Sequence, residues 1–498
     1  MTPHPPAPRR DLPFLLTASA ACAMTVLDAN VIGLVLPSIT RDLQSGFGEA
    51  EWVVGGYGLA FAALLLPAGS IADRFGRRRM LSIGIVAFAL ASLACGLAPN
   101  VLALTFSRVV QGVGAAFLLA PALATLGHAY RDEAERSRAW ATWGGIMGLA
   151  MVVSPLVGGL IAALAGWRFA FLLNLPLCAM LFVATRRWVG ESCDADRSRL
   201  DLPGFVLFAA GMLGVTWALI ASAHADISAA VVAASGAAGL ALLGAFVAIE
   251  RRSARPMLDL SLFGSLPFTG AVCAMFAYAA TAQVMASLLP LLLQNGRGLS
   301  VLSAGLAMMP FAVAMLILPH VGRRLSVRLG SRAMLALGLG VTVAGNLALA
   351  LAAGGRSAVG LALAMAVLGS GGGLLNGETQ KAIMAAIPAA RAGMGSGLST
   401  TARFSGILIG FTSLGAVLAA TLRRIADRTG ITANVAAQIA SGDAQHAASE
   451  PLRLLAQGVY SQAFAAVFLA AAGVAAVSAL FVWWSMGRKT ARVLAPSR

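Results

Sequence analysis

The chain has 498 residues, of which 59% are hydrophobic and 11% are charged, and its formal net charge is +16. A soluble domain is normally about one-quarter charged, so this composition excludes an ordinary soluble protein and indicates a membrane protein. The basic excess does not indicate a nucleic-acid partner, because the arginines lie in short segments between apolar runs rather than on one face of a domain.

Apolar segments follow one another along the whole chain, and each is close to the ~20 residues that a helix needs to cross a ~30 Å hydrocarbon core. We count fourteen, at residues 13–36, 51–71, 80–98, 101–125, 138–162, 168–187, 203–222, 228–249, 267–290, 301–320, 333–353, 358–386, 394–420 and 460–485. None shows the period-2 alternation of a membrane β-barrel. The sequence therefore predicts an all-α polytopic membrane protein with 14 transmembrane helices. The first run is longer than the apolar region of a signal peptide, so we expect it to be retained.

Lysine and arginine are distributed unevenly over the two sides of these helices. If the N-terminus is cytoplasmic, 26 of the 36 basic residues fall in cytoplasmic loops and tails and eight in outer loops. Because basic residues prefer the cytoplasmic side of a membrane, this bias predicts that both termini are cytoplasmic.

A charged hairpin between the second and third apolar segments is repeated later in the chain. The run from Arg74 to Leu81 is matched by Arg328 to Leu335, at a constant offset of 254 residues. Parallel repeats imply two helix bundles with a binding site between them. We predict a cytoplasmic tail at 1–12 and a first six-helix bundle at 13–187. A cytoplasmic linker with two extra helices follows at 188–264. The second six-helix bundle covers 265–485 and includes an outer loop at 421–458, and a cytoplasmic tail follows at 486–498.

Several motifs carry a family resemblance. In chain order they are the runs Leu27–Pro37, Gly69–Leu81, Arg108–Ala115, Ser154–Gly159 and Arg391–Gly406. In this order they resemble the major facilitator superfamily, and within it the fourteen-span drug:proton antiporters that include quaternary-ammonium and multidrug exporters. The resemblance implies the major facilitator fold, transport by alternating access, a bacterial inner-membrane location and no cofactor.

Three positions depart from the family pattern. Ser154 stands where the fifth-span antiporter motif usually has glycine, Val327 stands where the second loop copy would have the counterpart of Asp73, and Phe169 stands where a second tryptophan is common. Only the first loop therefore has a carboxylate at this position, Asp73, with which it can form a contact.

Two ionisable residues are candidates for proton coupling. Asp28 lies inside the first apolar segment, where an ionisable group costs at least ~2.5–3.5 kcal/mol and needs a reason. A carboxylate there could exchange a proton for a cationic substrate, because the two compete for one negative charge. It could equally be a buried structural group bonded to Asn30 or to a facing helix. Arg108 has no acid in its own span, so its partner must come from another helix. The resemblance associates this arginine with proton coupling.

A second set of residues is predicted to bind substrate. Glu378 could bind a lipophilic cation or a second proton, or it could pair with Lys381 three residues later at the membrane edge. Aromatic and methionine side chains could line an apolar pocket with cation–π capacity, or could simply pack against helices or lipid. The full predicted set is Glu378, Asn30, Gln111, Tyr57, Phe61, Tyr278 and Met275.

Two further groups of residues have conformational roles in this interpretation. The charged hairpin is expected to act as a gate, in which Asp73 caps a helix or pairs with arginines, and its members are Gly69, Asp73, Arg74, Gly76 and Arg77. The fifth segment resembles the antiporter hinge, in which Pro155 supplies a bend, and its members are Ser154, Pro155, Gly158 and Gly159.

The sequence thus predicts a proton-coupled exporter of hydrophobic, cationic compounds, acting as a monomer in a lipid bilayer with protons and a small molecule as its partners. It holds no phosphate-binding loop, nucleophile elbow or metalloprotease helix, so we expect neither an enzyme nor a metal site. The alternatives are an exporter of a neutral or anionic metabolite or antibiotic and a non-transporting membrane sensor.

Overall fold

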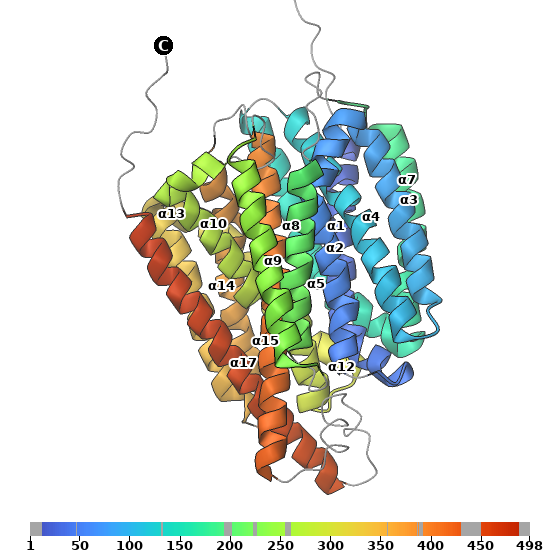
Figure 1. Ribbon diagram of the computed structural model, residues 1–498, viewed down its shortest axis with the longest axis vertical. Helices are drawn as coiled ribbons and strands as arrows, with labels where there is room; N and C mark the ends of the chain where they lie inside the picture. Colours follow the sequence, from blue (N-terminus) through green and yellow to red (C-terminus); the bar gives the residue numbers. More distant parts are fainter. Residues whose placement is uncertain are drawn as a thin grey trace, which may run out of the picture.

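The computed structural model describes residues 12–45, 47–130, 133–193, 202–222, 227–253, 260–355, 357–385, 387, 392–429 and 450–487. Long helices packed side by side make up this part of the chain (Figure 1). Thirteen of the described helices are long and apolar enough to cross a membrane, or 14 when the bent pair Trp52–Leu65 and Pro67–Phe75 counts as one span. The predicted all-α architecture is confirmed.

The helices of the first half are α1 Leu12–Asp42, α2 Phe47–Phe75, α3 Arg77–Gly96, α4 Val101–Ala129, α5 Glu133–Leu164, α6 Arg168–Leu172 and α7 Asn174–Trp188. The second half contains α10 Leu266–Tyr278, η2 Ala279–Gln283, α11 Met285–Leu291, η3 Leu292–Gly296, α12 Val301–Ala307, α13 Met309–Ala353, α14 Ala358–Ala385, α15 Ala392–Thr429 and α17 Glu450–Ser485. In the sequence, the two halves are connected by α8 Leu202–Ala221, α9 Ala229–Glu250 and the short η1 Leu260–Gly264.

Several helix pairs join the two halves in the described part of the chain. The first half meets the second where α1 packs on α11, α2 on α15, and α5 on α12 and α13. The two extra helices pack on each other, and α8 also covers the line where α2 meets α15. Leu59, Met212 and Leu408 form a small buried cluster at this place, with one residue from each of α2, α8 and α15.

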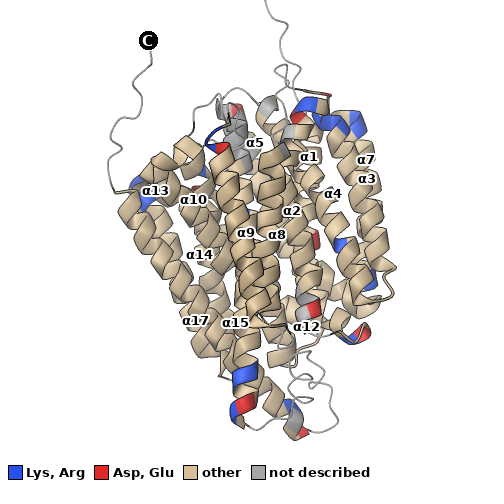
Figure 2. Cartoon of the chain, viewed as in Figure 1, with Lys and Arg blue, Asp and Glu red and all other residues tan. Residues whose placement is uncertain are grey.

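Charged side chains gather at the two ends of the bundle, as Figure 2 shows. We call the end where α1 begins and α17 ends the termini face, and the opposite end the distal face. On the termini face lies the charged hairpin, where α2 ends at Phe75 and α3 begins at Arg77. An apolar middle with charged ends is the pattern of a protein that crosses a bilayer.

The internal repeat is confirmed by the backbone. Gly76 has φ +105° and Gly330, its counterpart 254 residues later, has φ +72°. Residues with a side chain rarely adopt such angles, so glycine is needed at both turns. The backbone of α13 is non-helical at Gly330, and the two parts of α13 belong to the separate spans Val301–Ser326 and Arg328–Ala353. Each copy of the hairpin therefore joins two membrane helices on the termini face.

Two predicted boundaries differ from the structure. The outer loop expected at 421–458 is helical at both ends, because α15 continues to Thr429 and α17 begins at Glu450. Alanine, leucine and arginine are good helix formers, so the helices continue beyond the apolar stretch that hydropathy detects. The segment predicted at 267–290 reaches Gly296 and contains two π-helical turns, η2 and η3. Most of the predicted tails 1–12 and 486–498 lies outside the described residues, namely 1–11 and 488–498, as do parts of the linker and the outer loop.

Candidate functional site

A buried ion pair lies inside the first bundle. Asp28 on α1 and Arg108 on α4 are separated by 2.7 Å between Oδ2 and Nη1, and their side chains are each 1% exposed. The partner of Arg108 therefore comes from another helix, as its sequence context requires. Removing either member of such a pair would leave a charge buried without compensation.

Two amides complete the surroundings of the carboxylate. Gln111 Nε2 and Asn174 Nδ2 each donate to Asp28 Oδ1, at 2.9 and 2.8 Å. The same two amide nitrogens donate to Ser92 Oγ at 2.8 and 3.2 Å. The network thus joins α1, α3, α4 and α7. Asn30 does not take part in these bonds to Asp28, although the sequence left that option open.

An aromatic ring covers the guanidinium group. The ring centroid of Tyr57 lies 4.1 Å from Cζ of Arg108, close enough for a cation–π contact. Arg108 Nε also donates to the carbonyl oxygen of Val53 at 3.1 Å. These contacts require α2 and α4 to approach closely at Gly112, where a Cβ atom would lie 2.4 Å from the Tyr57 carbonyl oxygen. The glycine of the Arg108–Ala115 motif thus lets α2 reach the charged pair.

A row of contacting aromatic rings connects this pair to the second half. The centroids of Tyr57 and Phe61 are 5.7 Å apart. Phe61 in turn meets Phe404 of α15 edge to face, with centroids 4.1 Å apart. A continuous series of contacts therefore runs from Asp28 through Arg108 to a side chain of the other bundle.

Phe404 belongs to a pocket between the halves, which we call the central pocket. Its first-half wall is mainly apolar and consists of Val26, Leu119, Leu123, Trp143 and Met147. Its second-half wall is mainly polar and consists of Gln283, Gln380, Thr400, Arg403 and Phe404. The enclosed volume is about 40 Å³, which suits one or two water molecules rather than a drug. The halves must separate before a larger molecule can occupy it.

Arg403 is the charged member of the described pocket wall. Its Nη2 donates to Asn376 Oδ1 at 3.0 Å, and its Cζ lies 5.8 Å from the ring centroid of Tyr278. Both partners are neutral, in contrast to the carboxylate that faces Arg108. Arg403 lies within the apolar segment 394–420, and the sequence alone does not reveal that it faces the other bundle.

None of the residues predicted to bind substrate belongs to the described wall of the central pocket. Gln111 and Tyr57 belong to the charged network, and Phe61 reaches the wall through Phe404. Tyr278 lies beside Arg403, while Met275 is buried in the second-half core. Their predicted role as substrate ligands stays a prediction.

Glu378 is occupied by neighbours on the termini side of the second half. Its carboxylate lies 3.3 Å from Lys381 Nζ, and it accepts a hydrogen bond from Ser331 Oγ at 2.5 Å. The ion pair left open by the sequence is therefore present. Ser331 directly follows Gly330, so this acid contacts the second copy of the hairpin motif.

In the first copy of the hairpin, Asp73 pairs with Arg77 at 2.7 Å within its own motif. A residue that the sequence analysis missed caps the following helix: Glu191 accepts bonds from the backbone nitrogens of Arg78 and Arg79 at 3.0 and 3.2 Å. A carboxylate at a helix N-terminus is stabilising. Arg74 is exposed, and a side chain at Gly69 would meet Ala120 only at an ordinary contact distance.

The predicted hinge lies on α5, where this helix packs against α1 of the first half and α12 of the second. Ser154 is buried and donates to the carbonyl oxygen of Ala150 one turn earlier, at 2.5 Å. A side chain at Gly158 would meet Val31 of α1, and one at Gly159 would meet Leu302 of α12. The segment is thus a contact surface towards the distal face, and its role as a hinge stays a prediction.

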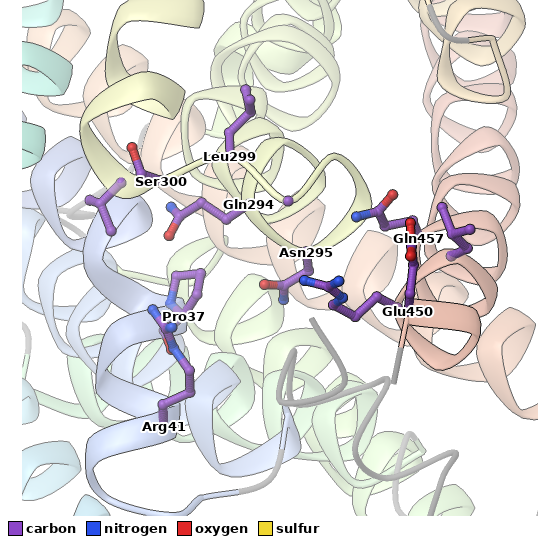
Figure 3. A pocket seen from close by; sticks show the side chains of 12 residues that line it. Pro37, Arg41, Gln294, Asn295, Leu299, Ser300, Glu450 and Gln457 are labelled. Carbon is purple, nitrogen blue, oxygen red and sulfur yellow. The ribbon is translucent and has the colours of Figure 1, made fainter. Parts of the chain in front are cut away.

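A second pocket opens between the halves at the distal face. Figure 3 shows Pro37 and Arg41 of α1 on one side of this pocket and Glu450 and Gln457 of α17 on the other. The volume of the pocket is about 550 Å³. Gln294 lies at its inner end and donates through Nε2 to the carbonyl oxygen of Leu34 at 2.7 Å. This bond joins the two halves at a position between the distal pocket and the charged network.

Comparison with known proteins identifies the family. Residues 18–411 match the model of the Major Facilitator Superfamily. The multidrug resistance protein Stp of Mycobacterium tuberculosis is 35% identical over 83% of this chain and 77% of its own length. The multidrug efflux pump LfrA of Mycolicibacterium smegmatis is 31% identical over 95% and 92%.

Solved structures share the fold at low identity. A bacterial homologue of the human lysosomal transporter Spinster, in an inward-facing and occupied conformation, matches with a TM-score of 0.66 and 18% identity over 95% of this chain and 96% of its own. A peptide transporter of the POT type in complex with sulfate matches with a TM-score of 0.65 and 17% identity over 94% and 93%. The chain is a multi-pass membrane transporter, not an enzyme, and it belongs to the Major Facilitator Superfamily.

Proposed function

We propose that this protein is a proton-coupled exporter of drugs or other toxic compounds that works by alternating access. The observation that carries the proposal is the Asp28–Arg108 pair, which is buried within helices that cross the membrane. Ionisable groups in such places are expensive and mark proton or substrate pathways. Stp and LfrA, which are named as multidrug resistance and efflux proteins, support export as the direction of transport.

In this proposal, the proton is carried by Asp28. Protonation removes the negative charge that holds Arg108, while the guanidinium group keeps its bond to the Val53 carbonyl oxygen. A weakened ion pair allows the ring of Tyr57 to move, and Phe61 transmits this movement to Phe404 in the other half. Proton binding thereby biases the halves towards one access state.

Coupling in this scheme is indirect, which differs from direct competition between a proton and a cation at Asp28. Three side chains already donate to that carboxylate, and it lies behind the central pocket rather than in its described wall. The substrate and the proton then occupy different sites, and the conformational change links them.

The orientation follows from the basic loops. With both termini in the cytoplasm of a bacterial inner membrane, the termini face is cytoplasmic and the distal pocket opens outward. One charge moving inward across the membrane is worth about 2.3 kcal/mol per 100 mV, so inward movement of a proton can drive export.

The test is proton movement in proteoliposomes that contain the purified protein. Wild-type protein is expected to move protons when a transported dye is added, and the Asp28→Asn variant is expected to move none. Because Asp28→Asn strands the Arg108 charge, the double variant Asp28→Asn/Arg108→Gln serves as a folding control. It should recover thermal stability while remaining uncoupled. A stable double variant with normal proton movement would contradict the proposal. A wild-type protein that transports nothing would also contradict it, and would indicate a membrane sensor instead.

A further inference from the structure

We propose that Arg403 selects the substrate, favouring amphiphilic compounds with an anionic or strongly hydrogen-bond-accepting group over permanent cations. This inference rests on the proposed function, because it takes the central pocket as the place where the exported compound binds. It also revises the substrate charge expected from the sequence.

The charge of the pocket wall is the first argument. Among its ten described residues, Arg403 carries a charge and no aspartate or glutamate is present. On the helices that supply the wall, Asp28 is already paired with Arg108 and Glu378 with Lys381. An arginine keeps its proton in a protein, so the side chain that lines the pocket in this structure carries a positive charge.

The contacts of Arg403 give the second argument. The described partners of its guanidinium group are Asn376 and the ring of Tyr278, which leave most of its five N–H donors available. A guanidinium group in a site with little water binds a carboxylate, sulfonate or phosphate through paired, charge-assisted hydrogen bonds. A cation about 6 Å away would instead lose on the order of 100-fold in affinity at an effective dielectric of about 20.

The two walls together define the shape of the substrate. The first-half wall offers apolar and aromatic side chains, and the second-half wall adds the amides of Gln283 and Gln380 beside Arg403. Within the described chain, the side-chain oxygen of Gln283 is buried and has no hydrogen-bond partner. A compound with an apolar body, an acceptor group for Arg403 and a donor for Gln283 satisfies every part of this surface.

The experiment uses two xanthene dyes that share a framework and differ in charge. Binding of anionic fluorescein and of cationic rhodamine 123 to the purified full-length protein is measured by fluorescence polarisation at pH 8. Wild-type protein should bind fluorescein more tightly. The Arg403→Gln variant should bind it about 10-fold or more weakly, with rhodamine 123 unchanged or bound more tightly, while Arg403→Lys should keep the wild-type order.

Arg423→Gln is a matched control, because Arg423 lies on the same helix but bonds to the Ser222 carbonyl oxygen outside the pocket. It should leave both affinities unchanged. A wild-type preference for rhodamine 123, or an equal loss of both dyes in Arg403→Gln, would overturn the inference. Charge-selective binding without proton movement in the proteoliposome assay would leave the role of Arg403 intact and refute the proposed coupling instead.

Discussion

The two halves share a repeated hairpin, but each holds an arginine within a membrane helix in a different way: Arg108 is buried and Arg403 is half-buried. In the first half, Arg108 faces a carboxylate, two amides and an aromatic ring, and it is sealed from the central pocket. In the second half, Arg403 lines that pocket beside neutral partners. The comparison teaches that proton handling and substrate recognition can be divided between the halves of one transporter.

The largest expected effect is a difference in stability between two arginine substitutions. Arg108→Met leaves Asp28 buried without its partner, so we expect a loss of about 3–5 kcal/mol in the free energy of unfolding. Arg403→Met strands no charge and should lose about 1–2 kcal/mol, the value of its hydrogen bond and ring contact. Denaturant unfolding in detergent measures both. Equal losses would remove the contrast between the halves.

A smaller effect is expected at the crossing of α2 and α4. Gly112→Ala places a methyl group 2.4 Å from the Tyr57 carbonyl oxygen, so the helices must move apart and the ring leaves Arg108. We expect a loss of about 1–3 kcal/mol, the usual range for overpacking. Gly127→Ala on the same helix is the control, because nothing lies within 4 Å of its Cβ position. A fully stable Gly112→Ala variant would mean that the close approach is not needed.

The smallest effect concerns the contact that joins the halves. A double-mutant cycle with Phe61→Leu and Phe404→Leu should give a coupling energy of about 0.5–1.5 kcal/mol, together with a reduced number of protons moved per dye. The stacked pair Phe208 and Phe246, within the extra helices, offers a control cycle. That cycle should show a coupling energy but leave the proton count unchanged. If both cycles left the proton count unchanged, the ring contacts would not transmit the proton signal.

Much of the fold could be predicted from sequence, because local patterns determine it. Apolar length located the membrane helices, and the 254-residue offset located both glycine turns. The need of Arg108 for an acid on another helix was also evident, since an unpaired charge in a membrane is costly.

The remaining contacts depend on which helix faces meet, which one sequence does not reveal. Asn174 and Gln283 are amides inside apolar runs, but nothing in the sequence indicates that one bonds to Asp28 and the other lines the pocket. Glu191 caps α3 from a position more than 110 residues away along the chain. The charge of the central pocket depends on Arg403, whose direction is set by the packing of α15 against α2.

The division between the two sites is tested most directly by calorimetric titration of fluorescein into wild-type protein and into the Asp28→Asn/Arg108→Gln variant. Titrations in buffers of different ionisation enthalpy give the affinity and the number of protons exchanged. The account predicts that the variant binds fluorescein within about threefold of the wild-type affinity but exchanges no protons, since separate sites need share only the conformational change. A folded variant that loses fluorescein binding, or that still exchanges protons as the wild type does, would contradict it.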